Sequence, residues 1–232
     1  MEVLWVTQSL LQVPADLNWL HSSEKEVLSK FRFEKRRNDW LLGRWTAKQC
    51  VKAWLKNIDS GVSLEQMAIV AADDGAPEVI INGHPLNCMI SLSHSHQTGL
   101  CAISSSTYKI GCDLEKIESR SPQLILDYFT EKEQAIVRQY DQEHTDFLAN
   151  LIWSAKESVL KALRLGLRLD TRKVEINCTL HEGKGSWHKL EISNSDFDHR
   201  FFGCWQRTDE YVMTMVSDQE DFKLLEVGSI NF

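Results

Sequence analysis

Apolar residues recur at helical spacing in two long stretches of the sequence, and shorter runs with strand-like alternation lie around them. In the first stretch, residues 34–56 with the positions that flank it, the apolar residues expected on one side of a helix are Phe33, Trp40, Ala47, Val51, Trp54 and Ile58. In the second stretch they are Leu148, Ile152, Ala155, Val159 and Leu163. Capping-box patterns at residues 23–26 and 130–133 predict that a further helix begins before each stretch.

The strand-like runs are short and are separated by turn residues. They predict strands at residues 3–6, 67–72, 78–81, 89–96, 99–104, 108–115, 174–180 and 187–192, with a hairpin over residues 201–216. Residues 218–232 carry no pattern that assigns them to an element. No short sequence repeat is visible, yet each half runs from helices into antiparallel strands. The pattern therefore predicts two similar lobes that meet around residues 104–108.

Composition and charge narrow the classes of function. The chain has 232 residues and a formal net charge of −7, so its surface should repel nucleic acid and anionic membranes. An anionic ligand would then need a local cluster of Arg and Lys. The six cysteines form no CxxC pair, no apolar run of membrane-spanning length occurs, and we expect no signal peptide. We therefore expect a cytoplasmic protein with reduced thiols that binds neither nucleic acid nor membrane.

Charged residues on the two predicted helices are the first candidates for chemistry. Glu157 and Lys161 are four residues apart in the favourable order, which is typical of an ordinary surface ion pair. Arg36, Arg37 and Arg44 project near the apolar side of the first helix, where each needs a carboxylate or a phosphate as its partner. Internal ion pairs and phosphate binding remain equal alternatives for these arginines. Lys48, by contrast, is expected to be a solvated charge.

Residues 108–115 place two carboxylates on one face of a strand. Strand alternation directs Gly111, Asp113 and Glu115 to the same side, and the glycine leaves room for something to approach. Two neighbouring carboxylates are unfavourable unless a cation lies between them, and oxygen ligands suit Mg²⁺. An ordinary solvent-facing strand is the alternative, because an Asp-x-Glu pattern is common by itself.

Three segments together resemble the 4′-phosphopantetheinyl transferases of the larger, two-lobed (surfactin-type, Sfp-like) class. They are residues 91–95 (Ser-Leu-Ser-His-Ser), residues 110–115 (Ile-Gly-Cys-Asp-Leu-Glu) and residues 153–157 (Trp-Ser-Ala-Lys-Glu) followed by Lys161. They occur in the order and at the separation of the family pattern. With the arginine-rich helix, the resemblance covers most of residues 30–165.

The resemblance implies a fold and a domain organisation. The expected fold is α+β, with two similar α/β lobes related by pseudo-twofold symmetry, each having helices packed on a small, mainly antiparallel sheet. The N-terminal lobe, residues 1–106, would bind the nucleotide of coenzyme A. The C-terminal lobe, residues 107–232, would carry the metal-binding and catalytic motifs, with the active site at the interface. Two joined lobes predict a monomer.

The resemblance also implies an activity and its residues. The enzyme would move the 4′-phosphopantetheine arm of coenzyme A to a serine of an apo acyl- or peptidyl-carrier protein in fatty acid, polyketide or nonribosomal peptide biosynthesis, and release adenosine 3′,5′-bisphosphate. Asp113, Glu115 and Glu157 match the ligands of Mg²⁺, which Mn²⁺ could replace. Glu157, or a metal-bound water that it orients, would be the base, and Lys161 would contact the phosphates. Lys156, His94, Arg44 and either Arg36 or Arg37 match positions on the coenzyme A side.

The chain departs from the family pattern at one point, and other functions stay open. Family members often have a basic residue where this chain has Ala76, so the grip on the nucleotide is weaker or lies elsewhere. His94 and His96 suggest zinc, but no third ligand is spaced near them. The alternatives are another Mg²⁺-dependent phosphoryl-transfer enzyme or hydrolase, or a non-catalytic module that binds coenzyme A or a carrier protein. Trp153 is expected to pack and fix its helix.

Overall fold

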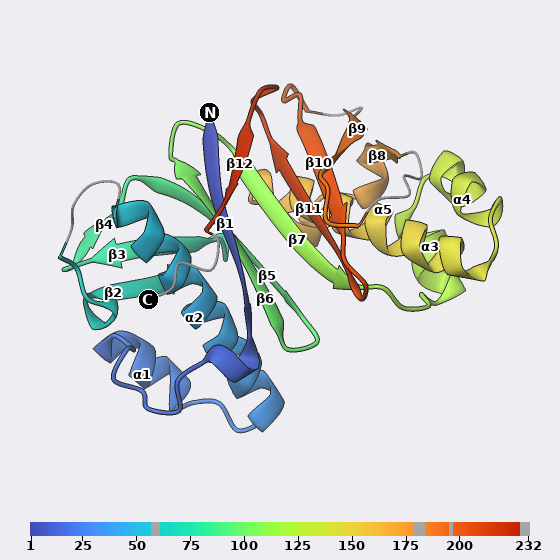
Figure 1. The fold of residues 1–232 in the computed structure, drawn as a ribbon. Helices are drawn as coiled ribbons and strands as arrows, with labels where there is room; N and C mark the ends of the chain where they lie inside the picture. The colour runs from blue at the N-terminus through green and yellow to red at the C-terminus, as the bar shows by residue number, and fades with distance from the viewer. Residues whose placement is uncertain (57–60, 179–183, 195–196, 228–232) are drawn as a thin grey trace. The chain divides into compact units, whose positions relative to one another are not determined.

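The computed structural model describes residues 1–56, 61–178, 184–194 and 197–227 (Figure 1). The chain divides into a first unit, Met1–Tyr108 with the segment that begins at Asp221, and a second unit, Lys109–Glu220. The division lies two residues after the boundary expected at residue 106. The sequence analysis placed the segment from Asp221 in the second lobe, but the structure places it in the first unit. Its strand pairs there with the N-terminal strand, because an edge strand offers unpaired backbone groups.

The first unit has helices and two sheets. Its elements are β1 (Glu2–Ser9), α1 (Ser22–Leu28), α2 (Glu34–Lys56), β2 (Met67–Ala71), β3 (Pro77–Ile81), β4 (His84–Pro85), β5 (Cys88–Ser95), β6 (Thr98–Ser105) and β12 (Lys223–Glu226). One sheet has the strand order β12-β1-β6-β5, and the other has the order β2-β3-β4. Strand β12 runs parallel to β1, while the other neighbours are antiparallel. Helix α2 packs against β1 and β6.

The second unit packs helices against a single sheet. Its elements are β7 (Ile110–Lys116), α3 (Pro122–Tyr128), α4 (Glu131–Arg138), α5 (Gln142–Ala162), β8 (Val174–Asn177), β9 (His188–Asn194), β10 (Phe202–Arg207) and β11 (Tyr211–Ser217). The strand order is β7-β11-β10-β9-β8, and all neighbours are antiparallel. The protein is therefore of the mixed α+β class, as expected. Of the strand expected at 174–180, residues 179 and 180 lie outside the described residues.

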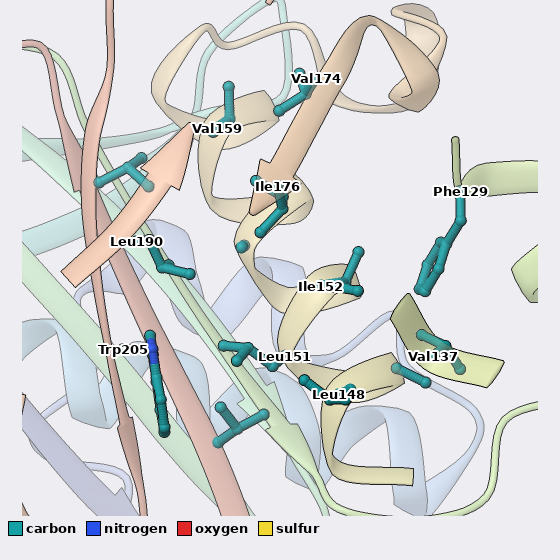
Figure 2. Close-up of a cluster of buried hydrophobic side chains, with 14 of the residues drawn as sticks. Phe129, Val137, Leu148, Leu151, Ile152, Val159, Val174, Ile176, Leu190 and Trp205 are labelled. Carbon is teal, nitrogen blue, oxygen red and sulfur yellow. The ribbon is translucent and has the colours of Figure 1, made fainter. Parts of the chain in front are cut away.

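Helix α5 forms the centre of the second unit's core because apolar residues occupy several of its faces. Leu148, Ile152, Ala155 and Val159 of the expected stripe are fully buried, and Leu163 caps the end of the helix. Leu151 points from the same helix toward Trp205 on β10, while Phe129 and Val137 cover another side (Figure 2). The core therefore surrounds the helix and fixes its position against β7 and β11.

The prediction of which residues form the buried side of α2 is only partly correct. Ala47 and Val51 are fully buried, but Phe33 lies before the helix and is 74% exposed. Ile58 lies outside the described residues. The buried face contains Leu41, Leu42, Cys50 and Leu55, which the projection left out. No helix in the described part of the chain has both the length and the apolar character needed to cross a membrane.

Candidate active site

Strand β7 and helix α5 approach each other at Gly111. A Cβ atom added there would lie 1.8 Å from the carbonyl oxygen of Ser158, so the glycine is required for this contact. The glycine was expected to leave room for something to approach, and the group that approaches is the backbone of α5. The face of β7 that carries Asp113 and Glu115 is therefore turned toward α5 and not toward solvent.

Asp113 and Lys161 form an ion pair between β7 and α5. The Lys161 Nζ lies 2.6 Å from Asp113 Oδ1, and it also donates to the carbonyl oxygen of Cys112 at 3.3 Å. Asp113 is buried, whereas Lys161 is 27% exposed. Burial opposes the charge on Lys161, but the attraction of Asp113 prevails and raises the pKa of this lysine. Lys161 is thus a charged group that reaches solvent beside a buried carboxylate.

Glu115 is held through both of its carboxylate oxygens. The Arg120 guanidinium donates to Oε2 at 2.6 Å, and the Trp153 indole N–H donates to Oε1 at 3.0 Å. Burial and the neighbouring Asp113 raise the pKa of Glu115, although Arg120 and Lys161 oppose that shift. Trp153 also packs edge-to-face on Tyr128, so it is a packing residue as expected and a hydrogen-bond donor as well.

Glu157 faces the same group of charges from α5. Burial raises its pKa, Asp113 and Glu115 raise it further, and Lys161 opposes them. The surface ion pair between Glu157 and Lys161 is absent from the described residues, because Lys161 turns to Asp113. Within that part of the chain the Glu157 carboxylate accepts no hydrogen bond. A half-buried carboxylate of raised pKa with open lone pairs can accept a proton or bind a cation.

The three carboxylates suit a divalent cation chemically, although they do not form a complete metal site as they stand. Across the described ranges, no group of three or more His, Cys, Asp or Glu side chains is arranged to hold a metal ion. Asp113 and Glu115 each raise the pKa of Glu157 while Lys161 lowers it, so the three carboxylates lie close enough to act on one another's charge. Mg²⁺ is commonly held by one or two carboxylates together with substrate phosphates, so this donor set fits it.

Lys156 is buried away from this group, contrary to the expected phosphate contact. Its side chain is fully inaccessible and lies 2.9 Å from Glu133 of α4, and it donates to the carbonyl oxygens of Thr171 and Val174. Burial lowers the pKa of Lys156, while Glu133 opposes the shift. A phosphate contact would require breaking this ion pair, so Lys156 is a structural residue here.

The remaining predicted residues lie in the first unit. Arg44 on α2 is 3.9 Å from Glu24 and stacks on Trp40 at 4.7 Å, so both alternatives for it retain support. Burial lowers the pKa of Arg44, and Glu24 opposes this. The other three expected residues are exposed or half-buried: Arg36 and Arg37 on α2, and His94 on β5. The expectation that they bind coenzyme A, at a site at the interface of the two lobes, stays a prediction.

Sequence reasoning missed Arg120 and Asn150. Arg120 lies in the connection after β7, where it also donates through Nε to Asn150 Oδ1 at 2.6 Å. Asn150 is fully buried on α5 and donates to the carbonyl oxygens of Glu118 and Asp146. An arginine five residues after Glu115 in an irregular segment has no periodicity that would assign its direction, so no sequence signal identified it.

Comparisons with known proteins place the second unit in a family context. A model of the 4′-phosphopantetheinyl transferase superfamily matches residues 109–216. A comparison with curated proteins found no match. Among solved structures, the chain is similar to a holo-(acyl-carrier-protein) synthase from Bacillus anthracis str. Ames in complex with CoA (3′,5′-ADP). The identity is 18%, with 47% of this chain and 93% of that chain covered at a TM-score of 0.39, which supports no conclusion about function.

Proposed function

Residues 109–216 belong to the 4′-phosphopantetheinyl transferase superfamily, and from this premise we propose that the protein moves the 4′-phosphopantetheine arm of coenzyme A to a serine of a carrier protein. The observation that carries the proposal is the clustering of Asp113, Glu115, Glu157 and Lys161 between β7 and α5, inside the matched segment. Adenosine 3′,5′-bisphosphate is the leaving group.

The chemistry assigns a role to each residue of the cluster. The serine oxygen attacks the phosphorus that bears the pantetheine arm, and the P–O bond to adenosine bisphosphate breaks. Glu157 accepts the serine proton, directly or through a water that it orients, because its carboxylate has open lone pairs and a raised pKa. Lys161 reaches solvent with its charge and stabilises the negative charge that develops on the leaving phosphate. Asp113 keeps that lysine in place.

A divalent cation completes the proposed site. Asp113, Glu115 and Glu157 would hold Mg²⁺, or Mn²⁺ in its place, which would neutralise charge on the pyrophosphate. The half-buried carboxylates and the ion pairs exclude part of the solvent, so the charges act in a lower dielectric than water. Lys156 has no role in this chemistry, because its ammonium group is buried against Glu133.

The first unit is proposed to bind the nucleotide end of coenzyme A. Arg44 is held by Trp40 and Glu24 with part of its side chain exposed, which suits a fork that binds phosphate. Arg36, Arg37 and His94 would add further contacts. Ala76 supplies no cation, so these residues would carry that role alone. A single chain with both units is proposed to act as a monomer.

We also propose that the protein belongs to the larger, two-lobed class. The supporting observation is that each unit packs one long helix on a sheet and buries a lysine of that helix against a glutamate. Lys48 meets Glu24 in the first unit, as Lys156 meets Glu133 in the second. Pseudo-twofold symmetry of the two lobes is part of this proposal.

The experiment incubates the protein with coenzyme A, Mg²⁺ and several apo carrier proteins, and measures the intact mass of each carrier. We expect one carrier to gain the mass of phosphopantetheine. Asp113→Asn and Glu157→Gln should each lower the rate by about 10²–10³-fold while leaving the fold intact. Arg172→Gln, an exposed change on the same unit, is the matched control and should act as the original protein does.

Two outcomes would favour the alternatives. If no carrier gains mass beside an active reference enzyme, while a phosphodiester substrate is hydrolysed, the protein is a metal-dependent hydrolase. If coenzyme A binds and no reaction occurs with any carrier, the protein is a binding module. Near-normal rates for Glu157→Gln would contradict the assignment of the base.

A further inference from the structure

Arg120 connects the candidate metal ligand Glu115 to helix α5. Its terminal nitrogen is 2.6 Å from Glu115 Oε2, and its Nε is 2.6 Å from Asn150 Oδ1. The Asn150 amide is itself fixed by the carbonyl oxygens of Glu118 and Asp146. Arg120 is only 16% exposed in its side chain, so the fork is held in one geometry rather than moving freely in solvent.

Each of the two carboxylates on β7 thus already forms an ion pair with a basic side chain of the protein. Asp113 is paired with Lys161, and Glu115 is paired with Arg120, both at 2.6 Å. These positive charges lie where a divalent cation would also have to come close. A cation within hydrogen-bond distance of a metal ligand repels an arriving metal, and the low local dielectric strengthens that repulsion.

Glu115 nevertheless has room for a second partner. Each carboxylate oxygen carries two lone pairs, and Arg120 and Trp153 use one on each oxygen. Each Glu115 oxygen therefore keeps one lone pair beyond those that Arg120 and Trp153 use. The guanidinium weakens the attraction for a free metal ion by its charge, while an anionic substrate that arrives with the metal would offset that charge.

We propose that the charge of Arg120, held against Glu115, makes tight binding of the divalent cation depend on the anionic substrate. This inference rests on the proposed function, since it assumes that Glu115 binds the metal. It assigns a role to a residue outside the recognised motifs. The charge effect and the geometric effect predict different results for two variants, which makes the role testable.

The experiment measures Mn²⁺ affinity directly, by electron paramagnetic resonance of the free ion, without and with coenzyme A. The variant Arg120→Gln removes the charge, whereas Arg120→Lys keeps the charge but loses the planar fork. Arg172→Gln is the matched control, because it removes an exposed arginine whose partner is Asp170. Thermal unfolding of each variant checks that the fold is kept.

We expect Arg120→Gln to bind Mn²⁺ about tenfold more tightly without coenzyme A, and to gain less from adding it than the original protein does. Arg120→Lys should keep the weak affinity, and Arg172→Gln should change nothing. Unchanged or weaker Mn²⁺ binding in Arg120→Gln would overturn the inference, as would equal behaviour of the Gln and Lys variants. Carrier modification by the original protein is measured separately, so a failure of the proposed function would be visible on its own.

Discussion

Helices α2 and α5 carry the same four-residue pattern, and each of them anchors its unit in the same way. The pattern is Trp-Thr-Ala-Lys at residues 45–48 and Trp-Ser-Ala-Lys at residues 153–156. Lys48 lies 2.5 Å from Glu24 and donates to two backbone carbonyls, and Lys156 lies 2.9 Å from Glu133 and does the same. Both lysines are fully buried, against the expectation that Lys48 is solvated.

The two glutamates are also bound alike. Glu24 and Glu133 each accept the backbone N–H at the start of their own helix, through a capping box. The other oxygen of each accepts a backbone N–H from a strand, Ile69 of β2 or Ile176 of β8. One carboxylate thus connects a short helix, a long helix and a strand in both units.

The units differ where the tryptophans donate. Trp45 donates to the neutral amide of Gln8 on β1, whereas Trp153 donates to the carboxylate of Glu115 on β7. The residue after each lysine is Gln49 in the first unit and Glu157 in the second. A shared framework therefore holds neutral amides in one unit and ionisable carboxylates in the other. Only the second arrangement carries negative charge that attracts a cation, and only its groups accept a proton near neutral pH.

The largest expected effect comes from the helix–strand contact that places the carboxylates. Gly111→Ala puts a Cβ against the backbone of α5 and should lower the free energy of unfolding by about 4 kcal/mol. Gly99→Ala in the first unit meets the side chain of Thr46 at 2.5 Å and should cost about 2 kcal/mol. Urea unfolding of both variants measures the difference. An equal cost would mean that α5 moves as easily as a side chain.

Replacing either buried lysine should lower the free energy of unfolding by nearly the same amount. Lys48→Met and Lys156→Met each leave a buried glutamate without its cation, and each should cost about 3 kcal/mol. Adding Glu133→Gln to Lys156→Met should recover part of the loss, because no buried charge then remains. Urea unfolding provides the free energies. A difference of more than about 1.4 kcal/mol between the single variants would contradict the shared framework.

Much of the fold followed from patterns that act over a few residues. The stripe of α5 and the alternation of residues 108–115 identified buried and paired faces, because both depend only on local spacing. Helix α3 was missed although Ser121 caps it and Pro122 begins it, and β12 was missed because its partner is the N-terminal strand. Pairing over that distance leaves little signal in a short run.

From the sequence, only those residues of the candidate site that belong to the family motif could be predicted. The motif identified Asp113, Glu115 and Glu157, but it also included Lys156, which the structure buries. The burial of Lys156 is decided by Glu133, which the sequence analysis took for a cap alone. The repeated Trp-x-Ala-Lys pattern was the missed signal, since two copies in similar helices point to a structural lysine. Arg120 had no comparable signal.

Replacing Trp153 should have a somewhat larger effect than replacing Trp45, although both effects are smaller than those above. Trp153→Phe removes a donor from a carboxylate, and Trp45→Phe removes one from a neutral amide, so we expect losses of about 1.5 and about 1 kcal/mol. Only Trp153→Phe should also lower the rate of carrier modification, because Glu115 loses its orientation. Urea unfolding and the mass assay measure the two effects. A rate loss of similar size in Trp45→Phe would show that packing alone explains it.

The smallest effect concerns Glu157 and its counterpart Gln49. The pKa of Glu157 is raised in the folded protein, mainly by burial, so its ionisation costs more in the folded than in the unfolded state. Stability should therefore decline as pH rises from the unfolded value through the raised pKa, in protein without added metal. Glu157→Gln removes that loss, so its Tm should exceed that of the original protein by a few degrees at pH 8, and the excess should shrink toward pH 4.

The reverse change in the first unit sharpens the test. Gln49 is buried, with 7% of its surface exposed, so Gln49→Glu should introduce a pH-dependent loss of stability where none of this origin exists. Thermal unfolding across pH 4–8 compares the two variants with the original protein. The expected curves diverge in opposite directions as pH rises. A Glu157→Gln curve parallel to that of the original protein would mean that solvent and Lys161 fully compensate the Glu157 charge, and the carboxylate would then lack the raised pKa that suits it to act as a base.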